Sequence, residues 1–117
     1  MAQPTVTEAP APSAAVPCAI AWIDPRRAIV VSMHPDREVT TCEIARGSLE
    51  ESVYLAQVVR VIGDCQRVVI LGPGTDRLAL EREYVDIFRR PERLVDVEPA
   101  RPVPPEELVR RLRVLAA

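Results

Sequence analysis

The sequence predicts an α/β fold in a single domain over residues 18–117, built on one five-stranded mixed sheet with flanking helices. Three short apolar segments near its start are separated by turn residues, which is typical of an antiparallel meander. The later segments alternate between helical periodicity and short apolar runs, as they do when helices connect parallel strands. A chain of 117 residues, with 48% apolar and 27% charged residues, fits one domain with a modest core.

The meander is expected in the first half of this domain. Residues 18–23 (CAIAWI) are apolar on both alternating faces, which is typical of a central strand. After the turn signal Asp24-Pro25, residues 27–33 (RAIVVSM) form a second strand rich in β-branched residues. After a turn at His34-Pro35-Asp36, residues 38–45 (EVTTCEIA) form a third strand, whose polar residues suit an edge of the sheet.

A helix is expected to follow and to end at Gly63. Ser48 and Glu51 have the spacing of a capping box, in which Ser48 caps the helix and Glu51 reaches back. The core-facing stripe has helical spacing and comprises Leu55, Val58, Val59 and Ile62. Three apolar residues lie off this stripe and predict an exposed apolar surface: Val53, Tyr54 and Val61.

A buried parallel strand is expected next, at residues 67–71 (RVVIL). The Gly72-Pro73-Gly74 segment after it suits a type II turn, with proline at the second position and glycine at the third. Thr75 or Asp76 then caps the following helix.

The last three elements are a helix, a strand and a helix. Residues 76–89 predict a helix that Pro91 terminates, with an apolar side formed by Leu80, Tyr84, Ile87 and Phe88. Residues 94–97 (LVDV) predict a short strand. Pro104-Pro105 and two acids then open a helix with an apolar stripe of Leu108, Leu112 and Leu115.

The element order is therefore β-β-β-α-β-α-β-α. The first and fourth strands are the most apolar, so we place them side by side at the centre of the sheet. A right-handed crossover from the third strand then gives the strand order 3-2-1-4-5. This is the ribonuclease-H-like arrangement.

Residues 1–17 (MAQPTVTEAPAPSAAVP) predict a disordered Ala/Pro-rich tail, with four prolines and neither the basic start nor the apolar run of a signal peptide. The three cysteines, Cys18, Cys42 and Cys65, lie far apart and fit neither a metal pair nor a disulfide framework. We interpret them as reduced, mostly buried thiols in a cytoplasmic protein. No apolar run is long enough to cross a bilayer, so no membrane partner is expected.

In the predicted topology, the carboxyl ends of the first, third, fourth and fifth strands meet at one end of the sheet, where open α/β sheets bind ligands. We call this end the rim. Its five arginines outnumber the acids Asp24, Asp76 and Glu98, and two helix N-termini point toward it, which suits phosphate or an RNA backbone. A solvated rim without a ligand is the other interpretation. The candidate binding residues are Arg26, Arg27, Arg46, Gly72, Gly74, Thr75, Arg77 and Arg101.

Several chemistries are disfavoured. All fifteen basic residues are arginine, so a P-loop lysine is absent, and no third glycine completes a dinucleotide fingerprint. A two-metal nuclease needs converging carboxylates, and only Asp24 is suitably placed; an Asx turn before Pro25 is its simpler role. His34, the single histidine, lies in a turn far from the rim. No catalytic residue, metal site or cofactor is therefore predicted.

The segment VVILGPGT, with LVDVEP and PPEELVRRL after it, resembles the central domain of archaeal/eukaryotic-type class 1 peptide chain release factors and of Pelota. WIDPRRAIVV resembles the opening hairpin of that domain, so the resemblance extends over residues 18–117. It implies a ribonuclease-H-like fold and a role in translation.

The release factors carry a catalytic Gly-Gly-Gln loop between the third strand and the first helix. Here the connection is Ala45-Arg46-Gly47-Ser48, and the glutamines are elsewhere, at Gln3, Gln57 and Gln66. Pelota also lacks the tripeptide and acts through binding. The resemblance thus implies a non-catalytic, ribosome-associated protein that contacts the ribosome, tRNA or a translation factor through the rim arginines. A protein-binding or homodimerising module remains the alternative, and a metal-dependent nuclease a remote one.

Overall fold

The computed structural model describes residues 15–117. Its elements, in chain order, are β1 (Cys18–Ile23), β2 (Arg27–Met33), β3 (Val39–Ala45), α1 (Glu51–Ile62), β4 (Arg67–Gly72), α2 (Asp76–Phe88), the 3₁₀ turn η2 (Pro91–Arg93), β5 (Leu94–Pro99) and α3 (Pro105–Ala116). Most of the predicted N-terminal tail lies outside the described residues. Ala15, the first described residue, is buried and donates its backbone N–H to the Pro35 carbonyl at 3.1 Å.

The sheet has the predicted order, β3-β2-β1-β4-β5. At its centre, β1 pairs antiparallel with β2 and parallel with β4. Every residue of β1 is buried, which confirms that residues 18–23 form the central strand. The fold is therefore the ribonuclease-H-like arrangement, with β3 and β5 as the two edges.

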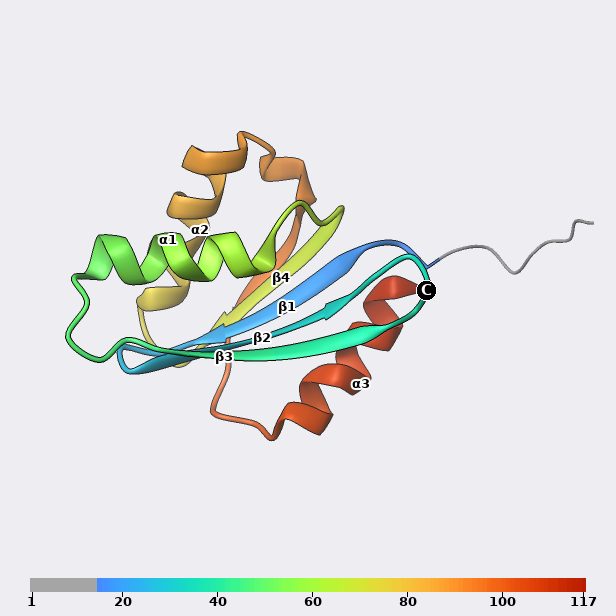
Figure 1. Cartoon of the computed structure of the whole chain (residues 1–117), viewed down its shortest axis with the longest axis horizontal. Helices are drawn as coiled ribbons and strands as arrows, with labels where there is room; N and C mark the ends of the chain where they lie inside the picture. Colours follow the sequence, from blue (N-terminus) through green and yellow to red (C-terminus); the bar gives the residue numbers. More distant parts are fainter. Residues whose placement is uncertain (1–14) are drawn as a thin grey trace, which may run out of the picture.

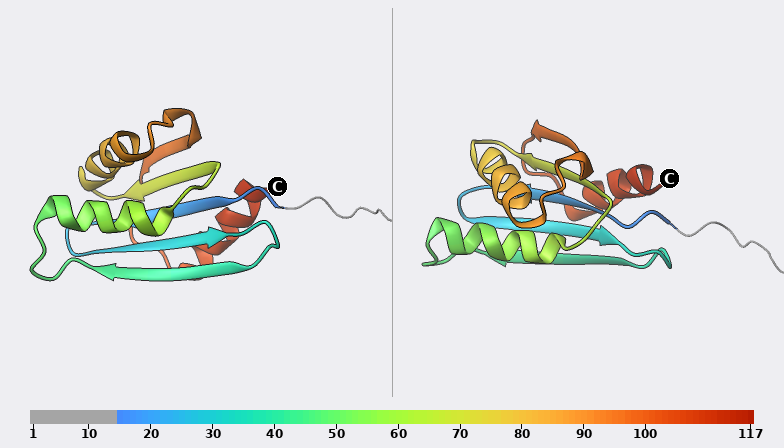
Figure 2. Two further views of the ribbon diagram at one scale, coloured as in Figure 1. Left: turned by 45° about the horizontal axis from the view of Figure 1, so that its top comes forward. Right: turned by 90° about the horizontal axis from the view of Figure 1, so that it is seen from above.

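Helices cover both faces of this sheet. Helices α1 and α2 lie on one face and α3 lies on the other, as Figures 1 and 2 show. The alternation of β1 supplies both cores: Ala19, Ala21 and Ile23 face α1 and α2, whereas Cys18, Ile20 and Trp22 face α3. A strand that is apolar on both faces thus requires a helical layer on each side.

Two aromatic side chains form hydrogen bonds that connect the end of β1 to α1 and to the segment before α3. The Trp22 indole N–H points toward the carbonyls of Ala100 and Arg101, at 3.2 and 3.1 Å. The Tyr54 hydroxyl donates to the Asp24 carbonyl at 3.0 Å. Tyr54 is fully buried, so its prediction as part of an exposed apolar surface is wrong. A buried tyrosine needs an acceptor for its hydroxyl, and the Asp24 carbonyl supplies it. Burial raises the pKa of Tyr54, which keeps the hydroxyl a donor.

The predicted capping box is also wrong. Helix α1 begins at Glu51 with Glu50 as its N-cap, and no side chain caps it. Ser48 lies instead within a tight turn closed by the Leu49 N–H and the Arg46 carbonyl at 3.0 Å. Gly47 stands in this turn with a φ of 55°, a left-handed conformation that favours glycine. The chain therefore turns before it becomes helical.

Helix α2 differs from its prediction at one apolar position. Leu80 and Tyr84 are buried, and Phe88 lies against the Tyr84 ring with centroids 5.0 Å apart. Ile87, predicted on the same side, is 47% exposed. The helix ends at Phe88, because Arg89 adopts a left-handed conformation with a φ of 57° before Pro91.

The Gly72-Pro73-Gly74 junction is not a type II turn. Such a turn needs a positive φ at Gly74, and among the described glycines φ is positive at Gly47 and Gly63. The need for glycine arises instead at Gly72, where a Cβ would lie 2.3 Å from the Ile23 carbonyl oxygen. Glycine therefore lets the ends of β1 and β4 approach closely.

Replacing Gly72 with alanine should destabilise the protein by about 2–4 kcal/mol, because the clash is with backbone that cannot rotate away. The matched control is Gly74→Ala, where a Cβ meets nothing within 4 Å; its effect should stay below about 1 kcal/mol. Urea unfolding followed by circular dichroism measures both. Equal effects of the two substitutions would contradict this interpretation.

All three cysteines are free thiols, but they do not share one environment. Cys18 and Cys65 are buried as predicted, whereas Cys42 is exposed on β3. Burial raises the pKa of both buried thiols, that of Cys65 to about 11. At pH 8 about one Cys65 thiol in a thousand is ionised, so it is a poor nucleophile as well as an inaccessible one.

Iodoacetamide at pH 8 should therefore add one label to each native chain, at Cys42, and three labels after unfolding. Mass spectrometry of the intact chain and its peptides gives the number and position of the labels. The Cys42→Ser variant is the control and should remain unlabelled while folded. Rapid native labelling of Cys65 would contradict the burial described above.

Candidate functional site

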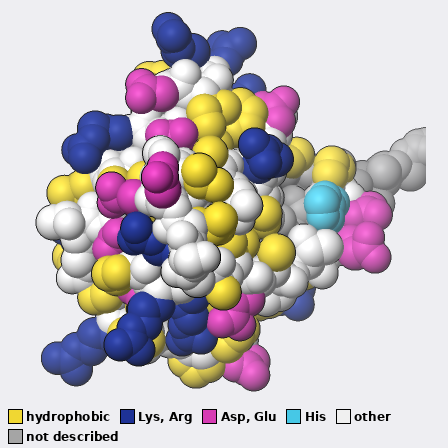
Figure 3. Space-filling view, turned by 60° about the vertical axis from the view of Figure 1, so that its left-hand side comes forward, with side chains coloured by type: hydrophobic (Ala, Val, Ile, Leu, Met, Phe, Trp, Pro, Cys, Tyr) yellow, Lys and Arg dark blue, Asp and Glu magenta, His cyan; other side chains and the backbone are white. Residues whose placement is uncertain are grey.

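The loops that follow β1, β3, β4 and β5 meet at one end of the sheet, on the left in Figure 1. Backbone hydrogen bonds join these loops. The Arg46 N–H donates to the Arg26 carbonyl at 2.8 Å, and the Ala100 N–H donates to the Gly72 carbonyl at 2.9 Å. The predicted rim is thus a continuous surface, and Figure 3 shows arginines and acids interspersed on this side of the molecule.

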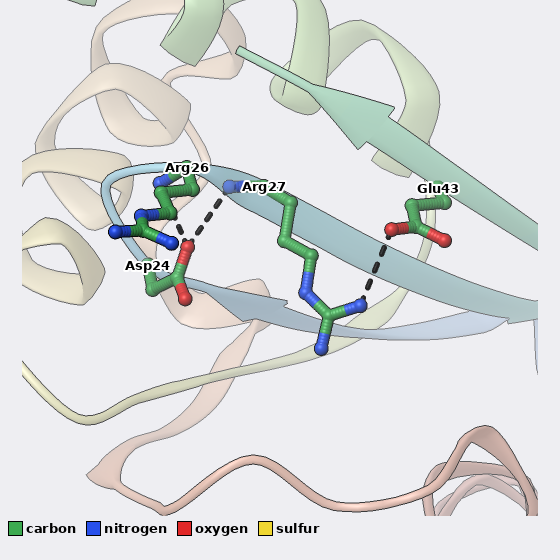
Figure 4. Close-up of polar contacts among 4 residues, drawn as sticks. All are labelled: Asp24, Arg26, Arg27 and Glu43. Atoms are coloured by element: carbon green, nitrogen blue, oxygen red, sulfur yellow. Dashed lines mark hydrogen bonds and ion pairs between the residues drawn. The ribbon is translucent and has the colours of Figure 1, made fainter. Parts of the chain in front are cut away.

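The β1–β2 turn is organised by Asp24. Its Oδ1 accepts the backbone N–H groups of Arg26 and Arg27, at 2.8 and 2.9 Å (Figure 4). This is the Asx turn that the sequence indicated. The Arg27 guanidinium points back along the sheet to Glu43 at 3.3 Å and lies 5.8 Å from the Trp22 ring centre. Arg27 is thereby held along the sheet by groups of its own chain.

Two further rim arginines also donate hydrogen bonds to carbonyl groups of this chain. The Arg46 Nε–H donates to the Leu49 carbonyl at 3.0 Å, and its guanidinium lies 5.9 Å from the Tyr54 ring centre. Arg77 donates through Nη1 to the Gly74 carbonyl, while its Nε is buried without a hydrogen-bond partner. Arg46 therefore shapes its own loop, and Arg77, in the first turn of α2, shapes the loop before it.

The remaining two arginines, Arg26 and Arg101, are exposed. Their guanidinium groups form no hydrogen bond or ion pair with any residue of the described range 15–117. Their backbones are nevertheless fixed: the Arg26 N–H is held by Asp24, and the Arg101 carbonyl by the Trp22 indole. The rim thus presents two free cationic side chains on anchored backbone.

The acidic side of the rim is larger than the sequence suggested. Glu50 is the N-cap of α1 and Glu51 is its first residue, whereas the predicted capping box placed the cap at Ser48. Asp76 is the first residue of α2. Glu98 is neutralised by Arg111 of α3, with the nearest atoms 3.1 Å apart. Sequence spacing alone gave no signal for this pair, because it depends on how α3 packs against the end of β5.

The described residues do not form the other kinds of site that the sequence analysis considered. Within residues 15–117, no group of three or more His, Cys, Asp or Glu side chains has metal-binding geometry. His34 is exposed in the β2–β3 turn, at the opposite end of β2 from the rim. No helix in this range is long and apolar enough to span a bilayer.

No protein-family model and no curated protein matches the chain. Solved structures do. The Pelota of Archaeoglobus fulgidus is similar at a TM-score of 0.62, with 14% identity over 85% of this chain and 31% of that chain. The Pelota of Thermoplasma acidophilum is similar at 0.61, with 20% identity over 86% of this chain and 33% of that one. The chain thus spans about a third of each Pelota, and it has the fold of a Pelota-like domain, as its sequence resemblance implied.

Proposed function

We propose that the protein is a non-catalytic, translation-associated binding protein that contacts the phosphates of ribosomal RNA or tRNA through the rim. The observation that carries this proposal is the pair of free, exposed arginines, Arg26 and Arg101, on a domain with a Pelota-like fold. A guanidinium without a partner among residues 15–117 is available for bidentate phosphate contacts.

The helices support an anion at the same surface. Neither α1 nor α2 has a side-chain cap at its N-terminus, so their first backbone N–H groups remain available to a ligand, against the opposing charge of Glu50, Glu51 and Asp76. Gly74 has open space where a Cβ would stand, which allows a phosphate to approach the backbone next to Thr75. In this proposal Arg46 and Arg77 hold the loops, and Arg26 and Arg101 make the contacts.

The β3–α1 loop supports a binding role in place of a hydrolytic one. Its two ends are tied by the Leu49 N–H to the Arg46 carbonyl and by the Arg46 side chain to the Leu49 carbonyl, both at 3.0 Å. A loop closed in this way is short and tight, so it cannot extend as far as a catalytic loop that must reach a distant substrate.

Changing both Arg26 and Arg101 to alanine should weaken binding to structured RNA about tenfold, since each arginine contributes a modest exposed phosphate contact. The slope of log affinity against log salt should fall by about one for each arginine lost. Fluorescence anisotropy with labelled tRNA over a salt series measures both quantities, and co-sedimentation with ribosomes tests the larger target.

The matched control is Arg82→Ala with Arg113→Ala, which removes the same charge from exposed positions on α2 and α3. These substitutions should leave the tRNA affinity within about twofold. The proposal is overturned if the native protein binds neither tRNA nor ribosomes. It is also overturned if the control pair weakens binding as much as the rim pair.

A further inference from the structure

The two edges of the sheet are built differently. Strand β5 has three features that hinder pairing with a further strand. These are a register shift against β4 at Val68/Val69, two acids and a terminal proline. Strand β3 (VTTCEIA) pairs with β2 in continuous register over seven residues and contains neither proline nor lysine. Within residues 15–117, the β5 edge is therefore protected and the β3 edge is not.

The outer side of β3 is open in the described part of the chain. Figures 1 and 2 show β3 as the outermost strand, and residues 40–43 are all exposed. Its one charged residue, Glu43, turns back across the sheet to pair with Arg27. The edge thus lacks the free charge that commonly keeps edge strands apart.

The hydrogen-bond pattern shows which backbone groups face outward. At the two ends of the β2–β3 ladder, the His34 N–H donates to the Glu38 carbonyl at 3.0 Å and the Arg46 N–H to the Arg26 carbonyl at 2.8 Å. Because bonded and non-bonded pairs alternate in an antiparallel ladder, the even-numbered residues of β3 bond to β2. The N–H and C=O groups that point outward belong to Val39, Thr41, Glu43 and Ala45.

We propose that two copies of this chain pair antiparallel through β3, about a two-fold axis at Cys42, to form one continuous sheet. In this register Thr41 faces Glu43 of the second copy and Val39 faces Ala45, so the outward groups meet in pairs. About eight backbone hydrogen bonds would form across the axis. The ground for choosing a second copy is that the outward residues of β3 lie symmetrically about Cys42, so its edge is complementary to itself in hydrogen bonding.

Only this register pairs the whole strand. A register shifted by two residues in one direction places Glu43 opposite Glu43 of the other copy. Like charges directly opposed destabilise a sheet. A shift in the other direction brings the Arg37 turn against Ala45 and leaves the strand ends unpaired. The proposed register places Cys42 opposite Cys42, and Thr40 opposite Ile44.

The neighbouring surface is compatible with this pairing. Val61 of α1 is 36% exposed and lines a hollow of about 400 Å³ at the end of the sheet opposite the rim, to which β3 contributes Thr40. The rim of each copy stays accessible in the dimer, because antiparallel pairing places the two rims at opposite ends of the joined sheet.

The first test changes the edge and leaves the β2 ladder intact. Thr41→Pro removes an outward N–H and obstructs pairing, while Thr41→Val keeps the N–H and the side-chain shape. Light scattering from low micromolar to submillimolar concentration should give twice the chain mass for the native protein and Thr41→Val, and the single-chain mass for Thr41→Pro. A native protein that stays monomeric, or a Thr41→Pro variant that still dimerises, overturns the proposal.

The second test uses the two-fold axis and does not depend on how well the proline variant folds. Cys42 is exposed, and only in the proposed register does it face itself. Cys42→Lys and Cys42→Glu should each be monomeric through like-charge opposition, and an equimolar mixture should form the mixed dimer, visible by native mass spectrometry. Failure of the mixture to pair overturns the register, whereas the tRNA affinity of each variant tests the proposed function separately.

Discussion

The structure depends on the burial of β1 on both of its faces. Ala19, Ala21 and Ile23 need cover on one side, and Cys18, Ile20 and Trp22 need it on the other. A single helical layer would leave half of this strand in water, so the chain must place α1 and α2 on one face and bring α3 to the opposite one. The path after β5 is the route by which the chain reaches that second face.

The same requirement creates the rim. The loops at the carboxyl ends of the strands collect at one end, and their positions are fixed by hydrogen bonds that Trp22 and Tyr54 donate and that the Asp24 side chain accepts. Arg46 and Arg77 donate to carbonyls inside these loops, whereas Arg27 pairs with Glu43 on the neighbouring strand. The loops therefore hold the backbones of Arg26 and Arg101 in place while leaving their guanidinium groups free, which limits the entropy lost on binding a phosphate.

Much of this arrangement was predictable from the sequence, because two-sided apolarity in residues 18–23 and 67–71 identifies the central strands and hence the strand order. The rest depended on contacts that spacing does not show. Tyr54 is buried because the Asp24 carbonyl accepts its hydroxyl, and Gly72 is needed because Ile23 lies against it. Which rim arginines are free depends likewise on carbonyls and carboxylates that only the folded loops bring within reach.

The position of α3 has a consequence for the order in which the chain can fold during its synthesis. Parallel pairing of Cys18 with Arg67 closes the centre of the sheet only after β4 has been made. The face that contains Trp22 then stays uncovered until residues 105–116 are available, when the Arg67 guanidinium reaches the Leu115 carbonyl at 2.7 Å and Leu108 and Leu112 fill the second core. A nascent chain in this interval presents a half-covered sheet, the kind of apolar surface that molecular chaperones protect.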